Sequence, residues 1–569
     1  MFRTLARKFL PNPLDRMLKQ AAKKGGRRIL LGWNRGLGDI ALGLYAIVQR
    51  IREIIPNAEI TFATRDNLVD GFSLLEGVRT VVMPDWKRGG PAKIDKAMKR
   101  QYDLVIEKPS PTDWVSWQRG KIVPKLRWDR RYDGLHEKFS LSEDSVYVGV
   151  QVSAETQYGL WRNWPLERWK ELFERLEAMH IQAVLFGYGD QPQFSNGNLI
   201  DLRGKTTLFE LLSLIKHRIS ALILPDSGIS SMIYYLDESF PIRHVTLWAD
   251  PNHGILKQRV PSPNPELIHC PLIAEKRDLS TVSVDAVVES LVSLRKTAAI
   301  LLAGGQGSRL GFKGPKGLFS IDGKTLFEYF CEKVPKGRPV AIMTSPLNHD
   351  ETIAYFRNHD CFGLDIYFFQ QEMASVLDME KRPTSLQAPN GNGGVFRSFV
   401  RSGLGEQFAE RGIDLVTVNY VDNPLGDPFD LALIAQALLK RAEIAVQCVE
   451  RRPEDRSMGA LIEKEGKWEV VEYTELGPLQ ECRYSYSGQL AIDLAFFRRM
   501  GEVELPIHWV RKTMEGRPVW KGEQFIFDVF PFAKKIAPFP VSRQTHYAPI
   551  KGPESIPIAE NRLREKVCK

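Results

Sequence analysis

The chain has 569 residues, more than one hydrophobic core usually organises, and a length of roughly 150 residues per domain suggests three or four domains. Apolar residues make up 43% and charged residues 26% of the chain, a composition typical of soluble globular proteins. The net charge of +9 is concentrated in residues 1–28, which hold nine Lys/Arg and one acid, and this excludes the basic folded surface that nucleic-acid binding requires.

Residues 1–28 are predicted to form a basic amphipathic leader. Its apolar residues recur near helical spacing around two prolines: Phe2, Leu5, Phe9, Leu10, Leu14, Met17 and Leu18. Peripheral contact with an anionic membrane is one interpretation, because each Lys or Arg near such a surface adds roughly 1 kcal/mol. A solvated tail, or a helix packed on the first domain, is the favoured alternative.

Several other classes are excluded by simple patterns. The leader lacks the apolar run of a signal peptide, and the chain has no stretch of about 18 apolar residues that could span a membrane. The six cysteines are scattered, without the spacing of a zinc site. We therefore expect a cytoplasmic protein with reduced cysteines.

Strands and helices are predicted to alternate through the first half, in the rhythm of parallel α/β sheets. The expected strands are 28–33, 59–63, 103–107, 146–152, 182–186 and 221–224, and the expected helices are 39–53, 165–179, 208–215 and 284–294. A new strand at 298–302 places the main boundary near residue 296.

Four short motifs follow strands in this half. They are GWNRGLGDI at 32–40, WRNWP at 161–165, DLRGKT at 201–206 and PDSG at 225–228. Over residues 28–275 the motifs resemble the heptosyltransferase family of GT-B glycosyltransferases. The resemblance implies that Asp39 is the general base for an acceptor hydroxyl, that Arg162 contacts the donor diphosphate and that Asp226 lies in a turn serving the same group.

Two features keep a non-catalytic interpretation open. Asp39 is also suited to cap its own helix, which requires no catalysis. The histidine that the family carries after the Asp-Ser-Gly turn is missing, because Ser230, Ser231 and Met232 follow here. An active glycosyltransferase and a retained scaffold are therefore both possible.

The expected strand at 298–302 runs into AGGQGSRLG at 303–311 and GPKG at 314–317. Gly304 and Gly305 allow the backbone to approach a nucleotide closely. Arg309 and Lys316 supply the positive charge needed when a sugar phosphate meets a triphosphate. An ordinary glycine-rich turn needs neither cation, so the segment predicts a nucleotide-binding loop.

This loop resembles the eukaryotic-type UDP-sugar pyrophosphorylases, and their UDP-N-acetylglucosamine pyrophosphorylase branch in particular. The likeness continues in order through FFQQ at 368–371, PNGNGG at 389–394, VDNPL at 421–425, VVEYTE at 470–475, FIFDVFPFAK at 525–534 and YAPIK at 547–551. The resemblance implies these site residues: Gln371 for uracil, Gly393 in a second glycine-rich turn, Asp422 for Mg²⁺, Glu472 and Gly488 for the sugar, and Lys551 for phosphate.

The residues themselves agree with part of this assignment. Asp422 follows the β-rich run 415–421 and is expected at the carboxyl end of a strand, where open α/β sheets place ligands. A carboxylate there suits Mg²⁺, although an Asx turn before Pro424 is an alternative. Gln371 can pair with a uracil edge through both groups of its amide, or be a plain strand-end residue. Lys551 is an ordinary loop lysine apart from the resemblance.

Two positions depart from the family pattern. The run at 486–489 reads YSGQ where the family has Asn-Ala-Gly-Asn, which leaves the sugar open. Arg451 stands where family members carry a lysine and presents a planar fork instead of a point charge.

The predicted organisation is a leader at 1–28, two GT-B-like Rossmann domains at 29–145 and 146–275, a linker helix at 276–296, and a GT-A-like nucleotidyltransferase domain with a mixed sheet at 297–569. The predicted function is uridylyl transfer from UTP to a sugar 1-phosphate. N-acetylglucosamine 1-phosphate is the expected sugar substrate, and Mg²⁺ is the expected cofactor. The alternatives are a bifunctional protein that also transfers sugar, and a non-catalytic sugar-nucleotide-binding protein.

Overall fold

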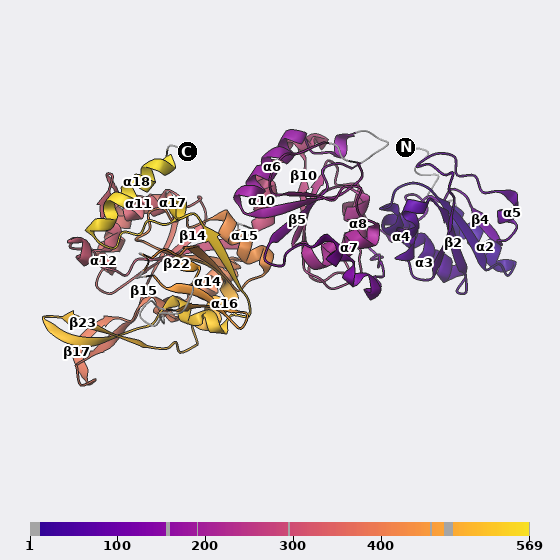
Figure 1. Cartoon of the computed structure of the whole chain (residues 1–569). Coiled ribbons are helices and arrows are strands. Elements are labelled where there is room, and N and C mark those ends of the chain that lie inside the picture. Colours follow the sequence, from indigo (N-terminus) through magenta and orange to yellow (C-terminus); the bar gives the residue numbers. More distant parts are fainter. Residues whose placement is uncertain are drawn as a thin grey trace. The chain divides into compact units, whose positions relative to one another are not determined.

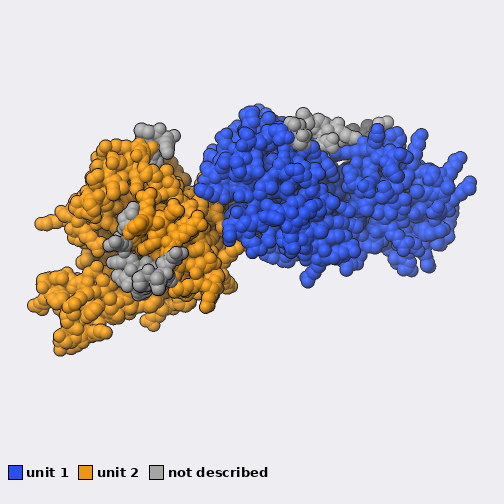
Figure 2. Space-filling view, in the orientation of Figure 1, with its two compact units in different colours: residues 1–291 blue, residues 292–569 orange. Residues whose placement is uncertain are grey.

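The computed structural model describes residues 12–154, 160–189, 192–293, 296–453, 455, 458–471 and 482–567. The chain divides into two compact units, Met1–Leu291 and Val292–Lys569 (Figures 1 and 2). The expected α/β class, with parallel sheets first and a mixed sheet later, is confirmed. Within the described residues, no helix combines the length and apolar character needed to cross a bilayer.

Unit 1 contains two fully parallel sheets. The first, in spatial order, comprises β3 (Val78–Val82), β2 (Glu59–Thr64), β1 (Arg28–Trp33) and β4 (Leu104–Ile106). The second comprises β10 (Leu267–Ile273), β9 (Ile242–Trp248), β8 (Ala221–Pro225), β5 (Val146–Val150), β6 (Ile181–Leu185) and β7 (Leu199–Asp201). The central strands are continuous buried runs, as parallel sheets covered on both faces require.

Most helices of unit 1 connect successive strands, whereas one precedes β1 and one follows β10 (Figure 1). They are α2 (Pro13–Lys23), α3 (Tyr45–Ile54), α4 (Val69–Ser73), α5 (Lys96–Lys99), α6 (Leu166–Ala178), α7 (Leu208–Arg218), α8 (Gly228–Tyr234), α9 (Gly254–Gln258) and α10 (Val284–Val292). Several begin at the caps that their sequences provide. In α7, for example, Thr207 accepts from the Glu210 amide and the Glu210 carboxylate accepts in return.

Helix α2 shows what the second part of the basic leader does. Leu14 and Leu18 are completely buried and belong to the core of unit 1. Asp15 forms a paired salt bridge with Arg50 of α3, with N–O distances of 2.6 and 2.8 Å. The packed-helix interpretation therefore holds for these residues, and the two leucines are not available to a membrane. Residues 2–10, on which the membrane prediction also depended, lie outside the described residues.

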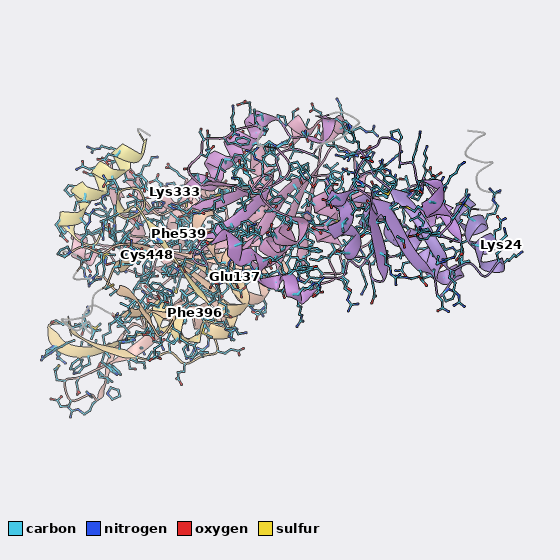
Figure 3. The ribbon with its side chains drawn as sticks, turned by 45° about the vertical axis from the view of Figure 1, so that its right-hand side comes forward. Lys24, Glu137, Lys333, Phe396, Cys448 and Phe539 are labelled. Atoms are coloured by element: carbon cyan, nitrogen blue, oxygen red, sulfur yellow. The ribbon has the colours of Figure 1, made fainter. Side chains whose placement is uncertain are left out.

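Unit 2 is built on one mixed sheet. Its spatial order is β15 (Asp365–Gln370), β14 (Pro339–Thr344), β11 (Thr297–Leu302), β18 (Leu415–Tyr420), β22 (Tyr484–Asp493), β19 (Ile444–Glu450) and β25 (Ile536–Val541). In addition, β20 (Ala460–Lys464) pairs with β22, and β21 (Lys467–Val471) pairs with β20. The first four strands are parallel, whereas β22 runs antiparallel to both of its neighbours. Phe396 and Cys448, labelled in Figure 3, belong to the core of this sheet.

A small antiparallel arm completes unit 2 (Figure 1). It contains β17 (Pro383–Pro389), β16 (Met373–Leu377), β24 (Arg517–Glu523) and β23 (His508–Met514), and a short hairpin, β12 (Ser320–Ile321) and β13 (Lys324–Thr325), precedes it in the chain. The α-helices of unit 2 are α11 (Leu326–Cys331), α12 (His349–Asn358), α13 (Val395–Arg401), α14 (Leu404–Glu410), α15 (Leu431–Lys440), α16 (Leu494–Met500), α17 (Arg543–His546) and α18 (Ile556–Val567).

Candidate functional site

The glycine-rich loop begins directly after β11 and folds back on itself. The Lys316 N–H donates to the Gly305 carbonyl at 3.0 Å, and the Gly307 N–H donates to the Gly314 carbonyl at 3.0 Å. These two bonds bring the end of the loop against its start. Lys316 is thereby held next to the glycines, although eleven positions separate it from Gly305 in the sequence.

Lys316 forms an ion pair with Asp422. Its Nζ lies 2.9 Å from Asp422 Oδ2, and the two side chains are 17% and 19% exposed. The pair forms because β11 and β18 are neighbouring parallel strands, so that the segments following them emerge at the same edge of the sheet. Because the pair is partly buried, solvent and salt screen its attraction less than they would on the open surface.

Gln371 approaches this loop from the end of β15. Its N–H donates to the Thr344 carbonyl at 2.8 Å, and its side chain is buried. A Cβ placed on Gly304 would lie 2.3 Å from Gln371 Nε2, which is closer than real contacts allow. The Gln371 amide group therefore lies close against Gly304, so the expected uracil-reading side chain is at the predicted loop.

The closing segment of the chain is bonded to the residues around Asp422. The Ile550 N–H donates to the Asp422 carbonyl at 2.8 Å. Asn423 donates to the His546 carbonyl at 2.8 Å and accepts from the Ala548 N–H at 2.9 Å. Lys551 is exposed and directly follows Ile550, the residue that is bonded to the Asp422 carbonyl.

A small cavity of about 20 Å³ lies between the end of β18, β22 and α11, and Val421 and Asn423, the chain neighbours of Asp422, line it. Its polar lining includes Asn419, Asn423, Ser487 and Gln489. Gly488, the sugar-site glycine of the sequence prediction, lines the same pocket with a φ of +95°. Gly488 therefore lines the same cavity as Val421 and Asn423, the residues on either side of Asp422 in the chain.

Other predicted residues are not gathered in this way. Gly393 is buried against the backbone of the 524–525 segment, and its N–H donates to the Gln524 carbonyl at 2.8 Å. Arg309 is exposed on the helical turn Ser308–Leu310, outside the Lys316–Asp422 pair. Glu472 lies outside the described residues.

The two positions that depart from the family pattern, Tyr486 and Arg451, both contact other parts of the protein. The Tyr486 side chain is buried, its ring stands edge-on to Phe527 at 6.2 Å, and burial raises the pKa of its hydroxyl. Arg451 donates to Ser485 Oγ at 2.9 Å and to the Met458 carbonyl at 3.2 Å. Its planar fork is thus used to bind the protein's own oxygens.

Unit 1 holds a second cluster, where loops from both of its sheets meet. Arg162, after β5, lies 3.3 Å from the Asp226 carboxylate, after β8, and 3.2 Å from Nδ1 of His253, after β9. Asp39, after β1, is within electrostatic reach of Arg162 and also of Arg35 and Arg88. We call these six residues the Asp39 cluster. His253, Arg35 and Arg88 were not predicted from the sequence.

Asp39 does not cap its helix. Its own backbone is helical, with φ −63° and ψ −21°, and its side chain makes no capping bond, so the N-cap interpretation is wrong. Instead, its carboxylate accepts from the Gly36 amide, and burial raises its pKa to about 6. A carboxyl group with a pKa near neutrality is suited to accept a proton in catalysis.

This pKa predicts how Asp39→Asn changes stability. Because the folded-state pKa is raised above 3.8, the folded state favours the protonated acid, and that advantage is lost as the pH rises through about 6. At pH 8 the asparagine variant should be more stable to urea than the wild type by about 1–3 kcal/mol, and below pH 4 the difference should vanish. Asp85→Asn, at an exposed position, is the control. A difference that is independent of pH would contradict the assignment.

Comparison with known proteins gives a match over residues 252–552 to the family described as UTP–glucose-1-phosphate uridylyltransferase. UDP-N-acetylglucosamine diphosphorylase 2 of Arabidopsis thaliana is 34% identical over 308 residues, which is 45% of this chain and 61% of that protein. UDP-N-acetylhexosamine pyrophosphorylase-like protein 1 of Homo sapiens is 30% identical over 313 residues, 46% of this chain and 62% of that protein.

Among solved structures, the uridine diphosphate N-acetylglucosamine pyrophosphorylase of Trypanosoma brucei in complex with an inhibitor matches with 26% identity and a TM-score of 0.44. That match covers 49% of this chain and 70% of the other. The chain spans about three fifths of the length of the two curated relatives above.

Proposed function

Because the chain belongs, through residues 252–552, to the UTP–glucose-1-phosphate uridylyltransferase family, we propose that unit 2 transfers the uridylyl group of UTP to a sugar 1-phosphate and releases pyrophosphate. The observation that carries the proposal is the ion pair of Lys316 and Asp422 at the edge of the sheet, beside the glycine-rich loop. Gln371, against Gly304, is the group that reads uracil.

The reaction needs charge and position more than it needs a base. A phosphate oxygen of the sugar 1-phosphate, already ionised at neutral pH, attacks the α-phosphorus of UTP in line. The new oxygen–phosphorus bond forms as the bond to the bridging oxygen of the β-phosphate breaks, and pyrophosphate leaves with the electron pair. Lys316 and Arg309 offset the negative charge gathered on the phosphates, and the loop amides add donors.

Asp422 is the residue that would hold Mg²⁺. Within the described part of the chain, no three His, Cys, Asp or Glu side chains form a ready metal site. A single carboxylate fits a Mg²⁺ ion that arrives with substrate phosphates, because this ion takes one or two protein carboxylates and fills its other positions with phosphate and water. When bound, the ion would neutralise phosphate charge.

N-acetylglucosamine 1-phosphate is the proposed sugar substrate. The run that the resemblance assigns to the sugar, Ser487 to Gln489, lines a small cavity together with Asn419. The buried oxygen of the Asn419 amide has no hydrogen-bond partner within the described residues. The names of the two curated relatives support the same sugar class.

The proposal is tested by product identity. The full chain, incubated with UTP, N-acetylglucosamine 1-phosphate and Mg²⁺, should form UDP-N-acetylglucosamine and pyrophosphate in equal amounts, as followed by ion-exchange chromatography. Formation of UDP or free phosphate in place of pyrophosphate would show a different reaction.

For unit 1 we propose a GT-B-like arrangement of its two sheets and, as a second function, glycosyl transfer. The specific observation is Asp39, which has a pKa of about 6 and lies among arginines where loops from two parallel sheets meet. Its carboxylate would take the proton of an acceptor hydroxyl. The alternatives are a scaffold for unit 2 and a sugar-nucleotide-binding unit without catalysis.

Asp39→Asn separates these alternatives. If unit 1 is catalytic, the slow hydrolysis of nucleotide sugars, in which water replaces the acceptor, should fall at least tenfold, equivalent to about 1.4 kcal/mol. Pyrophosphate release by unit 2 should be unchanged, since the two sites share no residues. A variant that hydrolyses nucleotide sugars as fast as the wild type would exclude Asp39 as the base.

A further inference from the structure

The turn that follows Asp422 is held by a lysine from another element. Lys333 lies two residues beyond the end of α11, and its side chain is labelled in Figure 3. Its Nζ donates to two main-chain carbonyls, that of Pro424 and, at 2.9 Å, that of Gly426. An ammonium group has three donors and a charge, so it can bind two carbonyls at once and more strongly than a neutral donor. Lys333 therefore holds the backbone directly after the carboxylate that pairs with Lys316.

The same helix also lies against the loop that carries Lys316. The Phe327 ring, on the first turn of α11, is fully buried, and a Cβ on Gly317 would lie 2.2 Å from Phe327 Cζ. The Leu326 N–H, at the start of the helix, donates to the Phe319 carbonyl at 3.1 Å. Helix α11 thus contacts the residue that directly follows Lys316 and is bonded to the end of the same loop.

The start of α11 is fixed by a reciprocal cap. Thr325 Oγ1 accepts from the Glu328 N–H at 3.1 Å, and the Glu328 carboxylate accepts from the Thr325 N–H at 2.6 Å. Such a capping box satisfies two donors that the first turn of a helix leaves free. The register of the helix is therefore defined, and with it the places of Phe327 at its start and of Lys333 beyond its end.

The turn after Asp422 also connects the other parts of the site. The Asn423 side chain is bonded to two backbone groups of the closing segment, and Gln489 of the predicted sugar run donates to the Asp427 carbonyl. A displacement of this turn would therefore move the metal residue relative to several neighbours at once. Lys333 joins the turn to α11, and through α11 to the glycine-rich loop.

We propose that Lys333 is a positioning residue for uridylyl transfer, and that α11 holds the Lys316 loop and the Asp422 turn at the separation that the reaction needs. The inference rests on the proposed function of unit 2. Because the Lys333 ammonium is bonded to carbonyls of the turn, its effect passes through Asp422 and not through a contact with the phosphates. Small displacements have large effects, since a misplacement of about 1 Å can lower a rate about a hundredfold.

Lys333→Met removes both donors and keeps an unbranched side chain of similar size. It should lower kcat for pyrophosphate release at least about tenfold and change the KM for UTP less than about twofold, because Gln371 is bonded to β14 and not to α11. Lys333→Arg, which can donate to both carbonyls, should keep most of the turnover. Lys336→Met, at an exposed position of the same segment, is the control and should match the wild type.

The loss is then compared in two backgrounds. If Lys333 acts through Asp422, Lys333→Met should lower the residual kcat of Asp422→Ala less than about twofold, against at least about tenfold in the otherwise wild-type chain. A merely structural defect would lower kcat by the same factor in both. Lys333→Gln, which stays polar and is one bond shorter, carries the same expectation and replaces the methionine variant if that variant does not fold.

Amide hydrogen exchange provides a readout that does not depend on activity. In Lys333→Met and Lys333→Gln, the amides of residues 423–427 should exchange faster than in the wild type, because the turn has lost the group that holds two of its carbonyls. The amides of β18, which are held in the sheet, should exchange at the wild-type rate.

Four results would overturn the inference: wild-type kcat in Lys333→Met, an equal loss in both backgrounds, a loss in Lys333→Arg as large as in Lys333→Met, or unchanged exchange in the turn. In each case pyrophosphate release by the wild type would leave the proposed function of unit 2 intact. Absence of release by the wild type with every sugar 1-phosphate would instead remove that function, and with it the reaction that Lys333 is proposed to serve.

Discussion

Replacing Asp422 by alanine is expected to lower kcat for pyrophosphate release at least tenfold, equivalent to about 1.4 kcal/mol of transition-state stabilisation. The carboxylate lies at the end of β18, where it pairs with Lys316 at 2.9 Å, and the charge that it helps to organise is greatest in the transition state. The fold should persist, because the backbone bond from Ile550 to the Asp422 carbonyl does not involve the side chain.

Lys316→Ala should have an effect of similar size. Because the two side chains contact each other, the double variant should lose less than the sum of the two single losses. Two exposed residues provide matched controls. They are Asp414→Ala, directly before β18, and Lys313→Ala, in the same loop as Lys316. Wild-type turnover in Asp422→Ala or Lys316→Ala would remove the pair from the mechanism.

Gln371→Ala is expected to raise the KM for UTP at least tenfold with a smaller effect on kcat. An amide that pairs with a base through both of its groups contributes about 1–3 kcal/mol of recognition. The neighbouring residue Gln370, the last residue of β15, is exposed, so Gln370→Ala should leave the KM unchanged. Steady-state kinetics with UTP and CTP provide the measurement.

The contrast between the two glutamines makes this prediction specific. Gln371→Ala should also reduce the preference for UTP over CTP, because the alanine cannot read the base edge. Equal effects at 370 and 371 would show that the strand end is sensitive to any change and would contradict base reading by Gln371.

Much of the fold could be predicted from hydrophobic runs. The strands at 28–33, 146–150 and 297–302 are buried on both faces and therefore appear in the sequence as continuous apolar segments. The antiparallel arm was not predicted, because its strands bury few side chains. In β23, His508–Met514, no residue is buried, so the sequence has no apolar pattern there.

One candidate site could be predicted from the sequence, whereas the other depends on tertiary packing. The loop with Gly304 and Lys316 is a local motif, and its partner Asp422 follows a recognisable strand. The Asp39 cluster is assembled from residues 35, 39, 88, 162, 226 and 253, each in a separate loop except for the first two. The motif resemblance groups Asp39, Arg162 and Asp226, but nothing in the sequence connects Arg35, Arg88 and His253 to them, since the packing of two sheets brings these loops together. A single histidine such as His253 carries no signal until Arg162 is found 3.2 Å away.

The central claim is tested most directly by the kcat/KM of pyrophosphate release, measured on the full chain with UTP and Mg²⁺ across N-acetylglucosamine, N-acetylgalactosamine and glucose 1-phosphates. The account predicts release that requires UTP, is fastest with N-acetylglucosamine 1-phosphate and falls at least tenfold in Asp422→Ala. Release from none of the three sugar phosphates, or equal release by wild type and Asp422→Ala, would contradict it.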